Sequence, residues 1–400
     1  MDNHLCEELA ARYGTPLLVY GGARLAENAR ATVSAFGGSA EEPRVFFPVK
    51  ACYLGAVLRL LAEIGLGAEV QSELEFHLAV RAGFAPARII FNGPGKTDGE
   101  LRLAVAEGVR AIHVESAEEL LALNEIARSH GRPVRIGIRV HVPMPDQSLP
   151  FAGAGWKFGA DVASGDALAL IKLALQQPHL RLAGLHVHNY AQQRSAHLHL
   201  AALRHLHGLV DQVPDWTPDY VDLGGGFAPR SALEGAGTGV QAIACALRRM
   251  ASAIAPTLWV EPGRLIVSDA AVVLTRVIRQ KVNSGRRWLL VDAATNFLVP
   301  GPFSRYEVQP VGQIDGPLVD TAVGDGLCLP GGVLNRAAQL PATVGTGDLL
   351  AVTGAGAYTL NFGSDFGYPA PAVLWLMGPE SEPVLLRPRS TPAEISDTWH

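Results

Sequence analysis

Residues able to do chemistry stand at the ends of several short apolar runs. Lys50 closes the run VFFPVK, which contains no other charge. A lysine at the end of a strand commonly extends its amine into solvent, but a buried lysine has a lowered pKa and can bond covalently to a carbonyl group. Glu69, His186 and His188 stand near the ends of two further runs. For His188 the ordinary interpretation is a core histidine with satisfied hydrogen bonds, and the functional one is a flat ring that stacks on a bound ligand.

Glycine-rich segments follow two later runs. The first segment is a set of three residues, Gly224, Gly225 and Gly226, and the second is Glu261-Pro262-Gly263-Arg264. Such glycines often form only a tight turn, but bare backbone amides in this position can also bind a phosphate. Glu261 can form a structural ion pair with Arg264, or its carboxylate can keep a pyridine nitrogen protonated.

The elements that must position these residues are short strands separated by helices. Apolar runs alternate with segments whose apolar residues recur every three or four positions, and uninterrupted apolar runs are typical of parallel strands covered on both faces. The runs are Arg44–Lys50, Leu66–Val70, Arg88–Asn92, Ala111–Glu115, Val134–Val142, Leu182–His188, Tyr220–Leu223 and Thr257–Glu261. Strand and helix repeated in this way predict an α/β fold, a TIM-like (β/α)8 barrel, with an open doubly wound sheet as the alternative. In such barrels the carboxyl ends of the strands carry the chemistry, and the turns after strands seven and eight often bind a phosphate.

Three helix starts follow predicted strands closely, which supports the barrel. They are Ser72-x-x-Glu75, Thr97-x-x-Glu100 and Ser116-x-x-Glu119. Each predicts a capping box, in which the hydroxyl accepts a hydrogen bond from the third amide and the carboxylate accepts one from the capping residue's own amide.

The pattern changes after residue 264. Segments from LIVSDAAVVLTRVIRQKV to PVLLRPR predict strands joined by glycine- and proline-rich turns, without helices between them. TPLLVY, at residues 15–20, precedes the barrel and is expected to join this later sheet. We therefore expect a barrel over residues 22–264 and an all-β domain, a sandwich or barrel, made of residues 1–21 and 265–400.

A lysine, a glycine turn, an acid and a flat ring at one rim match the needs of pyridoxal 5'-phosphate (PLP). This cofactor requires an amine, a phosphate site and an acid that keeps its ring nitrogen protonated. A metal site is the competing interpretation, and its ligands would come from His186, His188, Glu69 and Glu261. We favour PLP and expect no metal.

Taken in order, these segments resemble the fold-type III PLP decarboxylases, a family that includes ornithine, arginine and diaminopimelate decarboxylases. The matching segments span nearly the whole chain and are FFPVKA around Lys50, GLHVHN around His188, DLGGGF at 222–227, EPGR at 261–264, GDGLCLPGGVL around Cys328 and GAYTLNF around Tyr358. The resemblance implies a barrel of the alanine-racemase type with a β domain. It also implies a head-to-tail homodimer whose active sites lie at the subunit interface.

The resemblance further implies a role for each matching residue of the barrel. Lys50 would bind the cofactor covalently, His188 would stack on its ring, and Glu69 would be an acid near both. Glu261 would face the ring nitrogen. The phosphate would be bound by Gly224, Gly225, Gly226, Gly263 and Arg264.

Two matching residues lie in the β domain, and the sequence departs from the family at positions in both domains. Cys328 resembles the proton donor and Tyr358 the tyrosine near the phosphate, both contributed by the neighbouring subunit. Family members often carry an acid shortly after the cysteine to bind a distal amine, but here Leu-Pro-Gly-Gly follows. Ala191 stands where many relatives have a phosphate-binding serine. Arg305 is out of register with an arginine that diaminopimelate decarboxylases usually place nearby.

A narrower similarity bears on the substrate. Residues 89–124 resemble the same segment in decarboxylases of carboxylate-siderophore assembly and, less closely, in a carrier-protein-linked glutamyl decarboxylase. We therefore expect decarboxylation of a conjugated diamino acid, for example a citryl-diamino acid, in siderophore or other specialised biosynthesis. The alternatives are a diaminopimelate, ornithine or lysine decarboxylase, a PLP-dependent amino-acid racemase, and an inactive regulatory homologue.

The composition of the chain limits the classes of partner that we expect it to bind. A net charge of −5 provides no basic surface for nucleic acid. No apolar run approaches the roughly 20 residues that span a membrane, and the amino terminus lacks the pattern of a signal peptide. The four cysteines form no CxxC pair, so neither disulfides nor a structural zinc are expected. We expect a cytoplasmic enzyme that acts on a small amino acid.

Overall fold

The computed structural model describes residues 2–144, 156–299 and 306–398. Its chain divides into two compact units. The barrel unit comprises Ala26–Ile266, and the β unit comprises Met1–Leu25 together with Val267–His400. Arg305 lies outside the described residues.

The barrel unit is built on eight parallel strands that neighbour one another in chain order. These are β2 (Phe46–Pro48), β3 (Gly67–Val70), β4 (Ile89–Phe91), β5 (Ala111–Val114), β6 (Val134–His141), β8 (Leu180–Val187), β9 (Tyr220–Asp222) and β10 (Thr257–Trp259), with a two-residue strand β7 (Ala160–Asp161) beside β6. The amide of Phe46 donates to the Val260 carbonyl (2.9 Å) and the amide of Val260 donates to the Arg44 carbonyl (3.0 Å). These bonds join the last strand to the first, so the sheet is nearly closed. The predicted (β/α)8 barrel is therefore confirmed, and the open doubly wound alternative is wrong.

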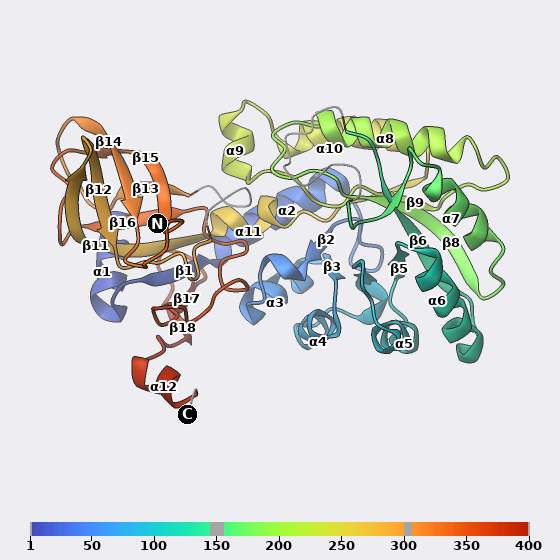
Figure 1. Ribbon diagram of the computed structural model, residues 1–400, viewed down its shortest axis with the longest axis horizontal. Helices are drawn as coiled ribbons and strands as arrows, with labels where there is room; N and C mark the ends of the chain where they lie inside the picture. Colours follow the sequence, from blue (N-terminus) through green and yellow to red (C-terminus); the bar gives the residue numbers. More distant parts are fainter. Residues whose placement is uncertain (1, 145–155, 300–305, 399–400) are drawn as a thin grey trace. The chain divides into compact units, whose positions relative to one another are not determined.

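Helices alternate with the strands and lie outside them (Figure 1). They are α2 (Gly22–Phe36), α3 (Gly55–Ile64), α4 (Glu73–Arg81), α5 (Asp98–Glu107), α6 (Ala117–His130), α7 (Asp166–Leu175), α8 (His197–Val210), α9 (Arg230–Gly235), α10 (Val240–Ala251) and α11 (Arg264–Val267). Two 3-10 turns accompany them, η1 (Val49–Ala51) and η2 (Pro86–Arg88), and a third, η3 (Ser268–Ala270), belongs to the β unit. No helix within the described ranges has the length and apolar character needed to cross a membrane.

Only one of the three expected capping boxes forms. The Thr97 hydroxyl accepts from the Glu100 amide (3.2 Å), and the Glu100 carboxylate accepts from the Thr97 amide (2.9 Å). At the other two helix starts the serine caps the helix, but the glutamate accepts from the amide one residue before the serine. These bonds join Gln71 to Glu75 (3.0 Å) and Glu115 to Glu119 (3.0 Å). Both glutamates also contact a donor side chain of the barrel, which holds their carboxylates away from the serine amides.

Aromatic rings fill part of the barrel interior. The ring of Trp259 stacks on that of Tyr220, with centroids 3.6 Å apart, and lies 5.0 Å from that of Phe46. A Cβ atom at Gly184 would lie 2.5 Å from Cζ of Tyr220, so only glycine leaves room for this ring. The interior is thus packed with side chains, and this fixes the positions of the polar residues around it.

The β unit is a largely antiparallel sheet. Its strands are β1 (Leu17–Gly21), β11 (Ala271–Asn283), β12 (Arg286–Val291), β13 (Glu307–Pro310), β14 (Leu318–Gly324), β15 (Val333–Pro341), β16 (Leu349–Thr353), β17 (Ala372–Leu376) and β18 (Val384–Arg387). The strand formed by TPLLVY, β1, lies between β11 and β17 and is parallel to β17. Two helices that the sequence pattern did not indicate, α1 (Asn3–Tyr13) and α12 (Pro392–Asp397), belong to this unit.

A buried histidine gives the barrel unit a pH-dependent stability. His199, on α8, is fully buried, and its Nε2 atom lies 3.0 Å from the Gly225 carbonyl oxygen. Burial lowers the pKa of His199 from its ordinary value to about 4. In the unfolded chain this histidine takes up a proton near pH 6.5. Between these two values the unfolded state binds more protons, so the free energy of unfolding falls as the pH falls.

We predict that His199→Gln reduces the slope of the free energy of unfolding against pH between pH 6.5 and 4. The reduction should correspond to about one proton, or about 1.4 kcal/mol per pH unit. Urea unfolding of the full chain at a series of pH values measures the slope. His197→Gln, at an exposed position of the same helix, is the matched control and should keep the wild-type slope. Equal slopes in both variants would contradict the prediction.

Candidate active site

The predicted site residues of the barrel lie at the carboxyl ends of its strands. Lys50 lies in the 3-10 turn η1, directly after β2, and Glu69 lies in β3. His188 directly follows β8, and Glu261 comes two residues after β10. Because parallel strands of a barrel present their carboxyl ends at one rim, the fold brings these residues to the same end. Lys50 and His188 lie just past the ends of their strands, and not within them as expected.

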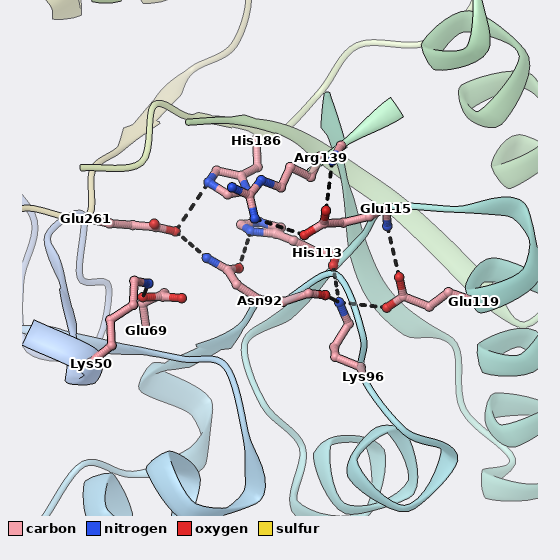
Figure 2. Close-up of polar contacts among 12 residues, drawn as sticks. Lys50, Glu69, Asn92, Lys96, His113, Glu115, Glu119, Arg139, His186 and Glu261 are labelled. Atoms are coloured by element: carbon pink, nitrogen blue, oxygen red, sulfur yellow. Dashed lines mark hydrogen bonds and ion pairs between the residues drawn. The ribbon is translucent and has the colours of Figure 1, made fainter. Parts of the chain in front are cut away.

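Lys50 and Glu69 form an ion pair at this rim (Figure 2). The Lys50 side chain is 30% exposed, whereas the Glu69 side chain is 1% exposed. The second carboxylate oxygen of Glu69, Oε1, is buried and has no hydrogen-bond partner among the described residues. The pair therefore presents a reachable amine above a buried acid.

Glu261 is buried in a cluster of polar groups. The Asn92 amide donates to its Oε1 atom at 2.7 Å, and Nε2 of His186 lies 3.6 Å from the same oxygen. Burial raises the pKa of Glu261 well above its ordinary value, and the neighbouring carboxylates of Asp222 and Glu69 raise it further. A carboxylate in this setting stays charged only if donors or cations face it.

The glycine turn after β9 lies directly against two other site residues. A Cβ atom at Gly224 would lie 2.7 Å from Cβ of His188, and one at Gly225 would lie 2.5 Å from the Glu261 carbonyl oxygen. The Gly224 amide donates to Oδ1 of Asp222 (2.8 Å), which holds the turn in place. Side chains at Gly224 and Gly225 would push apart the ends of β8, β9 and β10.

The remaining phosphate-site candidates of the barrel lie next to this turn. Gly226 has a φ of +81°, and a Cβ atom there would meet the Tyr190 carbonyl oxygen at 2.6 Å. Gly263 is buried, and Arg264 begins helix α11. Ala191, at the position where a serine was expected, is half-buried.

The imidazole of His188 is held neutral. Burial lowers its pKa well below the ordinary value, and the positive charges of Arg139 and Lys50 lower it further. Its Nδ1 atom is buried without a hydrogen-bond partner in the part of the chain that the structure describes. A neutral imidazole whose Nδ1 atom accepts and donates no hydrogen bond among the described residues is compatible with stacking on an aromatic ligand.

Several buried polar residues of the site were not predicted. Besides Asn92 and Asp222, they are His113, Glu115, Lys96, Glu119 and Arg139. Lys96 pairs with Glu119 at 2.7 Å, and Arg139 pairs with Glu115 at 2.9 Å (Figure 2). A polar residue within or directly after an apolar run, as in IIFN and AIHVE, is the signal that could have identified three of them.

Cys328 and Tyr358 belong to the β unit. The Cys328 thiol is exposed and follows β14. Tyr358 has a φ of +60°, and its ring lies 6.0 Å from that of Phe362. Their contribution to the site of a neighbouring subunit stays a prediction.

The residues of the barrel rim fit pyridoxal phosphate. Lys50 supplies an amine, Glu261 a buried acid, and the glycine turn the backbone amides of Gly225 and Gly226, whereas the Gly224 amide donates to Asp222. Oε1 of Glu69 and Nδ1 of His188 are buried and have no hydrogen-bond partner within the described ranges, so the site has polar groups ready for a ligand.

Comparison with known proteins agrees with this fit. Residues 23–268 match the family described as "Pyridoxal-dependent decarboxylase, pyridoxal binding domain". The chain is 31% identical over 397 residues to a diaminopimelate decarboxylase of Zymomonas mobilis, covering 97% of this chain and 93% of the relative. It is 35% identical over 369 residues to one of Pseudomonas aeruginosa, covering 90% and 86%.

Solved structures of diaminopimelate decarboxylases are also similar to this chain. The diaminopimelate decarboxylase of M. jannaschii in complex with L-lysine superposes with a TM-score of 0.85, at 25% identity over 98% of this chain and 93% of the other. That of Helicobacter pylori, also with L-lysine, gives a TM-score of 0.86 at 25% identity over 98% of both chains. These four relatives are diaminopimelate decarboxylases, so they lend no support to the expected siderophore substrate. The chain therefore belongs to the pyridoxal-dependent decarboxylase family, and it is a PLP-dependent carboxy-lyase.

Proposed function

We propose that this chain decarboxylates diaminopimelate, with PLP held on Lys50. The observation that carries the proposal is the Lys50–Glu69 ion pair at the rim that also holds the buried Glu261. The substrate follows from the diaminopimelate decarboxylases named above, which are 31% and 35% identical to the chain. This replaces the conjugated substrate that the sequence led us to expect.

The cofactor and the protein contribute different parts of the chemistry. When bound, PLP takes up the electron pair that the departing carboxyl group leaves behind. The Lys50 amine holds the cofactor, and Glu69 keeps that amine at the rim by its ion pair. Glu261 holds a proton at the ring nitrogen, and the neutral His188 ring stacks without adding positive charge. The amides of the glycine turn, with Arg264, bind the phosphate.

A second copy of the chain completes the proposed site. Cys328 would donate the proton that replaces carbon dioxide, and Tyr358 would lie near the phosphate. Large apolar side chains near Cys328 or Tyr358 support a protein interface, because such residues rarely gather on a surface without a partner. They include Leu329, Phe362, Phe366 and Tyr368, which are 45%, 60%, 56% and 40% exposed.

A conjugated diamino acid is the second candidate substrate, and one observation favours it. Cys328 is followed by Leu329 and no nearby acid, so a free distal amine lacks a carboxylate there. Asp325 cannot replace that acid, because it is buried and already accepts hydrogen bonds from Thr295 (2.7 Å) and Leu327 (3.0 Å). A substrate whose distal group is uncharged would suit the segment around Cys328.

Lys50→Ala should remove the covalent link to the cofactor. We expect the variant to lose the visible absorption of bound PLP and to carry no label after borohydride reduction, whereas the wild type is labelled on Lys50. Lys172→Ala, an exposed position on α7, is the control and should be labelled like the wild type. A labelled Lys50→Ala variant would refute the assignment.

Mixing two inactive variants tests the shared site. Lys50→Ala and Cys328→Ala should each release carbon dioxide at least about 100-fold more slowly than the wild type. If each site takes Lys50 from one subunit and Cys328 from the other, mixed dimers contain one intact site and recover part of the activity. A mixture no more active than its components, although exchanged subunits are demonstrated, would contradict the proposal.

A substrate screen separates the two candidates. Carbon dioxide release should be fastest with diaminopimelate and slower with ornithine, lysine and citryl-diamino acids. A higher kcat/KM for a citryl conjugate would contradict the main proposal and favour the second candidate. Chiral analysis of the recovered substrate identifies a racemase, which would change the configuration without releasing carbon dioxide.

A further inference from the structure

A chain of three hydrogen bonds runs through the barrel from Tyr220 to Glu261. The Tyr220 hydroxyl lies 2.9 Å from Nε2 of His113, and Nδ1 of His113 lies 2.7 Å from Oδ1 of Asn92. The Asn92 amide then donates to Oε1 of Glu261 at 2.7 Å. Figure 2 shows the part of this chain that joins His113, Asn92 and Glu261. All four side chains are buried, and they come from four different strands or strand ends, so the fold fixes their order.

The chemistry of the donors assigns a direction to this chain when Glu261 is ionised. A carboxylate only accepts, so the Asn92 amide group must face it and Oδ1 must face His113. Nδ1 of His113 then carries the proton that it donates to Oδ1. In a neutral imidazole Nε2 is therefore a bare acceptor, which the Tyr220 hydroxyl satisfies. Every bond points toward Glu261.

A neutral His113 is supported by its surroundings. Burial lowers the pKa of His113 well below its ordinary value, and the positive charges of Lys96, Arg139 and Arg135 lower it further. Arg135 also lies 5.1 Å from the centre of the Tyr220 ring. These cations favour a neutral imidazole at His113 and a Tyr220 hydroxyl that donates its hydrogen bond to Nε2.

The groups that face Glu261 explain why such a chain is needed. Asp222 and Glu69 are acids that disfavour its charge, and Lys50 is a cation that favours it. Nε2 of His186 lies 3.6 Å from Oε1, too far for a hydrogen bond. The Asn92 amide, by contrast, donates a hydrogen bond to this oxygen at 2.7 Å.

We propose that Asn92, His113 and Tyr220 are positioning residues that keep the Glu261 carboxylate ionised and oriented toward the cofactor ring. This inference rests on the proposed function, in which Glu261 faces the ring nitrogen. Asn92 acts directly on the carboxylate. His113 and Tyr220 act through Asn92, by fixing which end of its amide faces Glu261.

A metal ion is a weaker explanation of the same cluster. Potential ligand atoms of His113, His186 and Glu261 lie within 4.8 Å of one another. However, both ring nitrogens of His113 already face partners at hydrogen-bond distance, Asn92 and Tyr220. An ion would have to break one of these bonds, whereas the chain satisfies every member without an ion.

Carboxylate titration measures the effect on Glu261 directly. The full-length protein, labelled with 13C at glutamate side chains, is titrated with and without PLP, and the Glu261 signal is identified by its loss in Glu261→Gln. In the PLP-free protein Asn92→Leu should raise the midpoint for Glu261 by about one pH unit, because a hydrogen bond to a charged group is lost. Tyr220→Phe should shift the midpoint in the same direction by less. Tyr20→Phe is the matched control, because the Tyr20 hydroxyl is buried in the β unit and donates to the Gly356 carbonyl (3.0 Å).

Histidine tautomers test the direction of the chain. In 15N-histidine-labelled wild-type protein, His113 should carry its proton on Nδ1, and Tyr220→Phe should populate both tautomers. In the PLP-loaded enzyme the acid limb of kcat should move to higher pH in Asn92→Leu and Tyr220→Phe. In a Glu261→Gln background, Tyr220→Phe should no longer move it. A purely structural role would lower the melting temperature without moving the limb.

The outcomes separate this inference from the proposed function. An unchanged Glu261 midpoint in Asn92→Leu, or a wild-type His113 protonated on Nε2, would overturn the inference even if the enzyme is active. A wild type that binds PLP but decarboxylates no amino acid would overturn the proposed function, while the titration of Glu261 still decides whether the chain keeps that carboxylate ionised.

Discussion

Keeping a carboxylate charged inside a protein is the constraint on which this site depends. Glu261 lies among two other acids in the barrel interior, where charge is costly. The role proposed for it, opposite a protonated ring, would require that charge, so the surrounding residues would have to supply donors and cations. The Asn92 hydrogen bond and the nearby Lys50 amine meet this need. The same rim must also carry a reachable amine, and the Lys50–Glu69 pair provides it at the edge of the buried region.

The barrel could be predicted because its local signals agree with its tertiary structure. Eight apolar runs became eight strands, since uninterrupted apolar residues suit strands covered on both faces. Lys50 and Glu261 could be placed at strand ends for the same reason. The capping boxes were predicted less well. Glu75 and Glu119 bond to partners brought near by the fold, and sequence spacing does not reveal such partners.

The polar residues inside the barrel were harder to predict than those at its rim. His113 lies in the middle of an apolar strand, where a polar residue alone does not indicate a partner. Its bonds to Asn92 and Tyr220 join residues 21 and 107 positions away in the chain. Only the closed barrel brings these residues together. The pattern of the sequence therefore predicts where a site lies more readily than which buried groups tune it.

One segment of the β unit bears on the choice between the two candidate substrates. Both units carry segments that match the family, but the segment after Cys328 departs from it, with Leu329 and glycines in place of an acid. Relatives with 31% and 35% identity point to diaminopimelate, and this local difference points to a less charged distal group. The two candidate substrates differ in the distal group, so both require the same chemistry at the amino-acid end.

A crystal structure of the protein grown with PLP tests the central claim most directly. We expect continuous density from Nζ of Lys50 to the cofactor, with the phosphate at the glycine turn of residues 224–226 and the ring nitrogen within hydrogen-bond distance of Glu261. Cofactor joined to another lysine such as Lys96, or a phosphate bound away from the glycine turn, would contradict it.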